Sequence, residues 1–111
     1  MEIKSDHLKR CELVTLIGRF DSSTALDLEK ALRALMEAGN YRLVIDMGQV
    51  EYFGSAAIRA LVMAYKECRR WNRGDVRLAN VPANIRHVFE LAGLLPLIEI
   101  YENSTLAVGS F

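Results

Sequence analysis

A chain of 111 residues is long enough to bury a single hydrophobic core, and we expect residues 1–111 to form one domain. Fourteen basic and fourteen acidic side chains leave no formal net charge, which excludes a strong overall attraction to nucleic acid or to anionic membranes. The composition, 51% hydrophobic and 25% charged, is that of an ordinary globular protein.

The uncharged segments of the chain predict neither a membrane span nor a secretory signal. The apolar segment Leu91–Ile98 is far shorter than a membrane span and is interrupted by Gly93 and Pro96. Residues 1–4 lack the apolar segment of a secretory signal. We therefore expect a cytoplasmic protein with no membrane insertion.

Two strands come first in chain order. Glu2–Lys9 alternates weakly and predicts an edge strand, whose charges would discourage pairing with another chain. Glu12–Ile17 is more apolar and predicts a buried strand, joined to the first by a hairpin. Residues 18–24 then end this strand and start a helix, whose possible N-cap residues are Asp21, Ser22 and Ser23.

The first helix has an apolar face at helical spacing, formed by Ala25, Leu28, Leu32, Leu35 and Met36. Gly39 and Asn40 predict its end through a left-handed cap. Arg42–Asp46 follows as an apolar, β-branched run typical of a buried parallel strand, and residues 50–53 are predicted to form a turn.

From Ser55 the apolar spacing becomes helical. The predicted inward face is Ile58, Leu61, Val62, Tyr65 and Cys68, and the predicted outward face is Arg59, Lys66, Arg69 and Arg70. Residues 71–74 end this helix. The cations near its end complement the helix dipole on a solvated face, although a nucleic-acid patch is a second, weaker interpretation.

The last third predicts two more strand–helix units. Residues 75–81 form a core strand, and Pro82 begins a helix with an inward face of Ile85, Val88, Phe89 and Ala92. Residues 97–101 form the last strand and residues 104–108 a short helix. The order ββαβαβαβα predicts an α/β fold with a mixed, mostly parallel sheet and right-handed crossovers.

The sequence offers little catalytic chemistry. It contains no Gly-rich phosphate loop, and His7 and His87 have no cysteine or carboxylate at ligand spacing, so we expect no metal and no cofactor. Cys11 and Cys68 lack a CxxC spacing; a disulfide between them is possible, but buried, reduced thiols are favoured. No nucleophile–base set is apparent, so we do not expect an enzyme.

Ser55 lies in the first turn of a helix, directly after a core strand, where open α/β sheets place their sites. Its hydroxyl is either an N-cap that accepts a hydrogen bond from a helix amide or a group presented for modification. Judged from the residue alone, the cap is the favoured interpretation.

Several motifs carry a resemblance to a known family. The segment Gly18–Asp21 matches a Gly-x-Leu-Asp step before a first helix, and Leu43–Asp46 matches an apolar strand that ends in aspartate. Tyr52–Ile58 partly matches the signature Phe-apolar-Asp-Ser-Ser/Thr-Gly-Leu, and residues 81–86 and 91–94 match a later connection and a Gly-Leu close. Over nearly its whole length the chain resembles the STAS domain of bacterial anti-sigma factor antagonists.

The resemblance implies a function. In phosphorylatable members of this family, the serine after the aspartate receives phosphate from a kinase that also serves as the anti-sigma factor. Ser55 occupies that position, whereas Gly54, Ala56 and Ala57 replace the family's Asp, Ser or Thr, and Gly. The implied function is partner switching: the chain binds an anti-sigma factor or related serine kinase and is regulated by phosphorylation at Ser55. A phosphate there would face helix-start amides, and Arg59 could pair with it.

The predicted partner surface surrounds Ser55 and the Asp21–Thr24 loop, because both follow parallel strands and so meet at one sheet end. It comprises Asp21, Ser22, Ser23, Thr24, Tyr52, Phe53, Gly54, Ala56, Arg59 and Met63. Alternatively, Tyr52 and Phe53 only plug the sheet end. Two other functions stay open: a STAS scaffold or transporter-associated subunit in which Ser55 is only a cap, and a small-ligand or nucleotide-binding module.

Overall fold

A mixed sheet of five strands in the order β1-β2-β3-β4-β5 forms the centre of the computed structural model, which describes residues 1–111. Only β1 is antiparallel to its neighbour. The strands are β1 (Glu2–His7), β2 (Glu12–Phe20), β3 (Arg42–Phe53), β4 (Asp75–Ala79) and β5 (Ile100–Tyr101). This α/β order confirms the predicted fold class.

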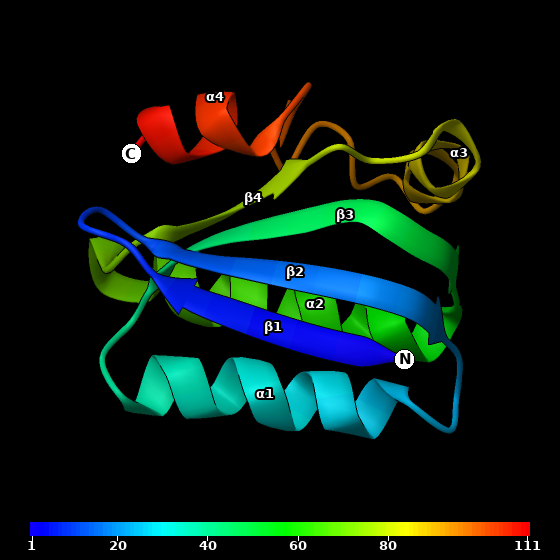
Figure 1. Ribbon diagram of the computed structural model, residues 1–111, viewed down its shortest axis with the longest axis horizontal. Helices are drawn as coiled ribbons and strands as arrows, with labels where there is room; N and C mark the ends of the chain where they lie inside the picture. Colours follow the sequence, from blue (N-terminus) through cyan, green and yellow to red (C-terminus); the bar gives the residue numbers. More distant parts are fainter.

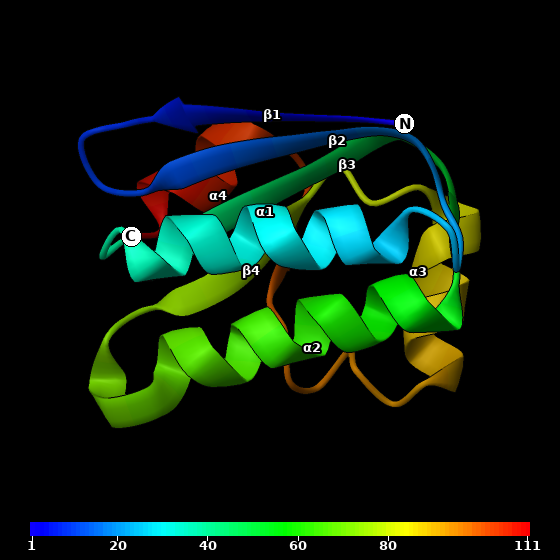
Figure 2. The ribbon, with the colours of Figure 1, turned by 90° about the horizontal axis from the view of Figure 1, so that it is seen from below.

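The helices form two layers around this sheet. In Figure 2, α1 (Ala25–Glu37) and α2 (Ser55–Arg69) lie side by side on one face. In Figure 1, α4 (Ser104–Gly109) lies on the opposite face, against β3 and β4, and α3 (Ala83–Leu91) lies beyond the carboxyl end of β4. A 3₁₀ turn, η1 (Arg70–Asn72), follows α2.

The main core lies between the sheet and the helices α1, α2 and α3. The buried face of α1 consists of Ala25, Leu28, Leu32 and Met36, as its apolar spacing predicts, while Leu35 is half-buried. On the other sheet face, Val44 and Ala79 pack with Ala107 of α4 in a smaller cluster. Because helices cover both faces of β3, its apolar run is unbroken from Leu43 to Ile45.

Several predicted boundaries and faces are wrong. β3 does not turn at residues 50–53 but runs to Phe53, because Met47, Val50 and Phe53 stay buried and its pairing with β2 continues to Phe20. The last strand is only Ile100–Tyr101, since the amides of Leu97 and Ile98 bond to the Leu94 carbonyl in a turn.

The third difference concerns α2. Its buried residues are Ala57, Ala60, Leu61, Ala64 and Cys68, whereas Ile58, Val62 and Tyr65 are only half-buried. Small side chains let α2 approach the sheet and α1 closely, so the larger ones lie at the sides of the contact. In α3, similarly, Ile85 and Phe89 are buried but Ala92 is exposed.

Both cysteines are buried and unpaired, so the disulfide alternative does not hold in this structure. Burial raises the pKa of the Cys68 thiol to about 12, and burial together with the Glu12 carboxylate raises the pKa of the Cys11 thiol. Both side chains therefore pack as small apolar groups in the neutral form.

Phe53 should be essential for stability, because its ring packs between Phe20 and Phe89 at centroid distances of 6.0 and 5.8 Å. We expect Phe53→Ala to lower the free energy of unfolding by about 3–5 kcal/mol, through lost burial and the cavity left behind. Tyr52→Ala, next to it but 44% exposed, is the matched control and should cost far less. Equal losses in urea denaturation would contradict this placement of Phe53.

Candidate functional site

The connections β2–α1 and β3–α2 lie next to each other at one end of the sheet. Phe20 and Phe53 are register partners in the parallel β2–β3 pair, and the amide of Gly54 donates to the Phe20 carbonyl at 2.9 Å. Figure 2 shows both connections at the same end of the sheet. The expectation that the Asp21–Thr24 loop and Ser55 share one end is therefore confirmed.

Ser55 is the first residue of α2, and its side chain is exposed. The N-cap residue is Gly54, in extended conformation, which has no side chain to cap the helix. The Ser55 hydroxyl makes no hydrogen bond to the protein, so the capping role favoured from the residue alone is wrong here. Its hydroxyl instead points out at the helix end where the dipole favours negative charge.

The Asp21–Thr24 loop is held by its own side chains. The Asp21 carboxylate accepts hydrogen bonds from the amide and the hydroxyl of Ser23, at 2.9 and 2.6 Å. The Asp21 amide donates to Thr24 Oγ1 at 3.0 Å, and the Thr24 hydroxyl donates to the Arg19 carbonyl at 3.1 Å. These bonds, chiefly those from Ser23, hold the pKa of Asp21 below its usual value.

None of the predicted N-cap residues of α1 occupies that position. The N-cap residue is Thr24, and its hydroxyl bonds backward to the loop rather than forward to the helix amides. The reason is local: the carbonyl of Asp21 already accepts from the amides of Thr24 and Ala25 at 3.2 and 2.9 Å. The loop is therefore a preformed turn that leaves Ser22 and Ser23 exposed.

Tyr52 lies across Gly54, beside Ser55. A Cβ atom at Gly54 would lie 3.1 Å from Tyr52 Cε2 and 3.3 Å from its hydroxyl. The Arg19 guanidinium is 4.8 Å from the centroid of the Tyr52 ring, a cation–π contact. The sequence alone does not indicate this pair, because Arg19 pairs with Tyr52 only after irregularities in the register beyond Thr15 and Gly18.

The remaining predicted partner residues differ in accessibility. Phe53 is only 2% exposed, so it plugs the sheet end and is not a surface contact. Ala56 and Arg59 line a groove between the first turns of α1 and α2, together with Ser22, Ala25, Leu26, Glu29 and Ala60. Arg59 also borders a second groove along α2, with Ile58, Val62, Met63, Lys66 and Glu67.

Leu26 is a site residue that sequence reasoning missed. Its side chain is 55% exposed at the rim of the groove between α1 and α2. Its position three residues after the last predicted N-cap residue, Ser23, and outside the apolar face of α1 is the signal that could have identified it.

The groups around Ser55 form neither a metal site nor a nucleophile–base pair. The structure contains no cluster of three or more histidine, cysteine or carboxylate side chains that could hold a metal ion. Ser55 has no base within hydrogen-bonding reach that would activate its own hydroxyl. None of the helices has the length and apolarity needed to span a bilayer.

The STAS domain family model matches residues 2–107, so the chain belongs to the STAS domain family. This confirms the family expected from the motifs. A Bordetella bronchiseptica protein named "Putative anti-sigma factor antagonist BtrV" is 28% identical over 111 residues, which cover 100% of this chain and 95% of the relative.

Two solved structures show the same fold. An anti-sigma factor antagonist from Mycobacterium paratuberculosis has a TM-score of 0.89 and 23% identity, over 98% of this chain and 92% of that one. The Bacillus cell fate determinant SpoIIAA, in its phosphorylated form, has a TM-score of 0.76 and 14% identity, over 98% of each chain.

The lowered pKa of Asp21 gives a test of the loop. Because the folded state binds this proton more weakly than the unfolded chain, the ionised carboxylate stabilises the fold above the ordinary aspartate pKa. That contribution is lost as the pH falls through the lowered pKa. We expect Asp21→Asn to melt at a lower temperature than the parent protein at pH 7, and the difference to disappear in strong acid.

The control for this prediction is Asp6→Asn on β1, an exposed aspartate without a hydrogen bond to the loop. Thermal melts of the three proteins across acidic and neutral pH provide the measurement. A difference between parent and Asp21→Asn that does not change with pH would mean that the charge of Asp21 does not hold the loop.

Proposed function

We propose that this chain is an anti-sigma factor antagonist that acts by partner switching. In its unmodified form it binds an anti-sigma factor that is also a serine kinase, and phosphorylation of Ser55 releases that partner. The observation that carries the proposal is the exposed Ser55 hydroxyl at the start of α2, free of any capping bond. The name of the BtrV relative supports the first part, and the phosphorylated form of SpoIIAA supports the second.

The partner surface in this proposal is built on two helices. It consists of the Asp21–Thr24 loop, Leu26 of α1, the strand end at Tyr52 and Gly54, and the first turns of α2 at Ala56, Arg59 and Met63. Leu26 and Tyr52 are each about half exposed, at 55% and 44%, and supply apolar area next to Ser55. Apolar surface rimmed by polar groups is typical of protein-binding sites.

The energetics favour a switch of binding rather than of folding. A phosphoserine at position 55 would carry roughly −1.5 to −2 charges at neutral pH. At a helix N-terminus such a charge stabilises α2 by about 0.3–1 kcal/mol. Inside a docked interface it must be desolvated, which costs several kcal/mol unless the partner supplies a cation. The penalty in the complex therefore outweighs the gain in the free domain.

The three departures from the family signature have separate physical meanings. Ala57 is fully buried, so it serves packing under the site. Gly54 removes a carboxylate from the place where a kinase would contact the substrate, and Ala56 removes a second hydroxyl. These departures favour the alternative function, a STAS scaffold or transporter-associated subunit that is not phosphorylated.

The switch predicts an order of affinities for the cognate anti-sigma factor. We expect Ser55→Ala to bind as well as the unmodified protein, phosphoserine to abolish binding, and Ser55→Asp to weaken it in part because it brings less charge. Ser55→Ala should change the free energy of unfolding by less than about 0.5 kcal/mol, since no cap bond is lost.

Isothermal titration of the four forms measures these affinities, and melting temperatures control for folding. Ser104→Asp is a matched control because Ser104 begins α4 on the opposite sheet face. Four similar affinities would contradict the switch and support the scaffold.

Gly54→Asp should raise the rate at which a serine kinase of this family phosphorylates Ser55. It restores the carboxylate of the signature, and the backbone of Gly54, with φ −82° and ψ 178°, is open to any residue. The new Cβ requires only that the exposed ring of Tyr52 give way by a few tenths of an ångström. A phosphate-transfer assay makes the comparison, and Gly54→Asn separates the charge from the bulk. Equal rates for all three proteins would show that Gly54 is no defect.

A further inference from the structure

The end of the sheet opposite Ser55 concentrates positive charge. There the β1–β2 turn, the α1–β3 connection and the α2–β4 connection come together, as Figures 1 and 2 show. Its cations outnumber its acidic groups: Lys9, Arg10, Arg42, Lys66, Arg69, Arg70 and Arg73 lie here with Glu12, Glu37, Glu67 and Asp75. The zero net charge of the whole chain hides this local excess.

Trp71 is the most exposed large apolar residue of the chain, at 76%, and the sequence has no other tryptophan. Both Trp71 and Asn72 have left-handed backbones, with φ of 55° and 57°. That conformation is costly for residues other than glycine. The chain thus bears backbone strain at a position where its only indole ring is presented to solvent, a combination that indicates a binding role.

Two arginine side chains lie against this ring. The Arg70 guanidinium lies 4.3 Å from the Trp71 centroid, and that of Arg73 lies 5.5 Å from it. Arg73 is also 4.0 Å from the Tyr41 ring and donates to the Glu67 carbonyl at 2.6 Å. Arg70, Trp71, Arg73 and Tyr41 therefore form a continuous row, in which the Glu67 carboxylate pairs with Arg70 at 3.8 Å and with Arg73 at 3.3 Å.

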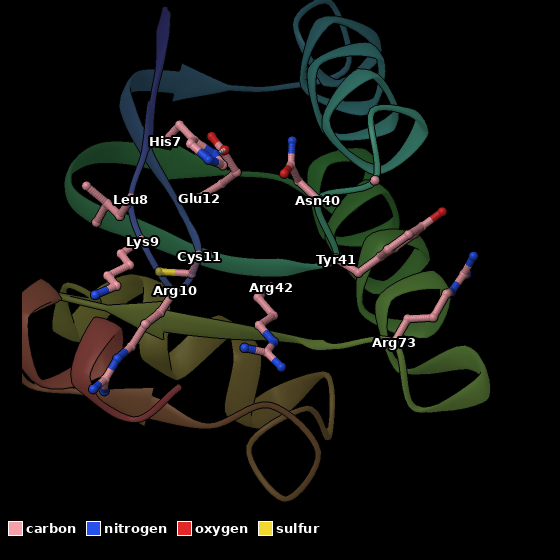
Figure 3. A pocket seen from close by; sticks show the side chains of 11 residues that line it. His7, Leu8, Lys9, Arg10, Cys11, Glu12, Asn40, Tyr41, Arg42 and Arg73 are labelled. Carbon is pink, nitrogen blue, oxygen red and sulfur yellow. Dashed lines mark hydrogen bonds and ion pairs between the residues drawn. The ribbon is translucent and has the colours of Figure 1, made fainter.

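Tyr41 joins this row because of Gly74. A Cβ atom at Gly74 would lie 1.9 Å from the Tyr41 carbonyl oxygen, so only glycine lets the two connections touch. Tyr41 and Arg73 line a cavity of about 200 Å³ that continues past Arg42 to the β1–β2 turn. In Figure 3, Arg42 lies between the Tyr41–Arg73 pair and the turn that carries Lys9 and Arg10. Arg42 is exposed and makes no ion pair.

We propose that Tyr41, Arg42, Arg70, Trp71 and Arg73, here called the Arg–Trp surface, bind an acidic segment of a protein partner that carries an apolar side chain. Acidic groups of the partner pair with Arg42 and compete with Glu67 for Arg70 and Arg73, and the apolar side chain covers the indole ring. Tryptophan, tyrosine and arginine are the residues that dominate protein–protein binding energy.

This site is separate from the one around Ser55, because the two lie at opposite ends of the sheet. The domain can therefore hold a second protein in either phosphorylation state of Ser55. Such binding would tether the chain to an assembly while its other end exchanges partners.

The test uses a fluorescein-labelled peptide of glutamates around one phenylalanine, and a second peptide with lysines in place of the glutamates. Because Trp71 is the only tryptophan, a shift of its emission to shorter wavelength reports binding at this surface. We expect the shift with the acidic peptide only. Duplex DNA and phosphatidylglycerol vesicles are the competing ligands, and tighter binding of either would overturn the proposal.

Variants separate binding from folding. We expect Trp71→Gly and Arg70→Ser each to lower the affinity for the acidic peptide about tenfold, as measured by the fluorescence anisotropy of the labelled peptide. Trp71→Gly should not lower the melting temperature, since glycine accepts the left-handed backbone without strain. Ser55→Asp and Arg86→Ser, which removes an exposed arginine of α3, should each change the affinity less than about twofold.

Three results would contradict the proposal. Equal weakening by Arg86→Ser would mean that only overall charge is sensed. A melting temperature of Trp71→Gly well below that of the parent would assign Trp71 a structural role. The absence of an emission shift with the acidic peptide would show that the indole is not covered.

Discussion

The parallel pairing of β2 with β3 is the constraint on which the site depends. It extends to the last residues of both strands, Phe20 and Phe53, and ends in the bond from the Gly54 amide to the Phe20 carbonyl. The strand pairing and this last bond hold the two strand–helix connections together, so a loop distant in sequence becomes the neighbour of Ser55. Beneath them the Phe20, Phe53 and Phe89 rings and the fully buried Ala57 form a packed floor.

The packed core beneath Ser55 limits the structural change that a charge at this position can cause. Packed cores resist continuous deformation, and α2 already presents the favourable end of its dipole there. In the proposed switch, a phosphate would add charge to the surface without a force that unfolds the helix. The functional change would then fall on the docked partner, while the fold of the domain stays the same.

The sequence predicted what is determined by local periodicity and missed what depends on contacts across strands. The apolar face of α1, the helix after Pro82 and the position of Ser55 follow from spacing along the chain. The extension of β3 does not, because it depends on β2 continuing past Gly18. At Gly18, φ is +98° and a Cβ atom would lie 3.2 Å from the backbone of Met1. The alanine face of α2 was likewise missed, because hydrophobic size favoured Ile58 and Val62 over smaller residues.

The same reasoning explains why the Arg–Trp surface is not visible in the composition. The row from Arg70 to Tyr41 joins segments about thirty positions apart, and only the close approach at Gly74 brings them together. Along the chain the arginines follow α2 and so look like ordinary complements of its dipole. In the folded chain, Arg70 and Arg73 flank the exposed indole of Trp71, and Arg73 lines the same cavity as Arg42. A dipole accounts for cations at a helix end but not for a strained tryptophan among them, and this difference is what separates a binding surface from a solvated helix terminus.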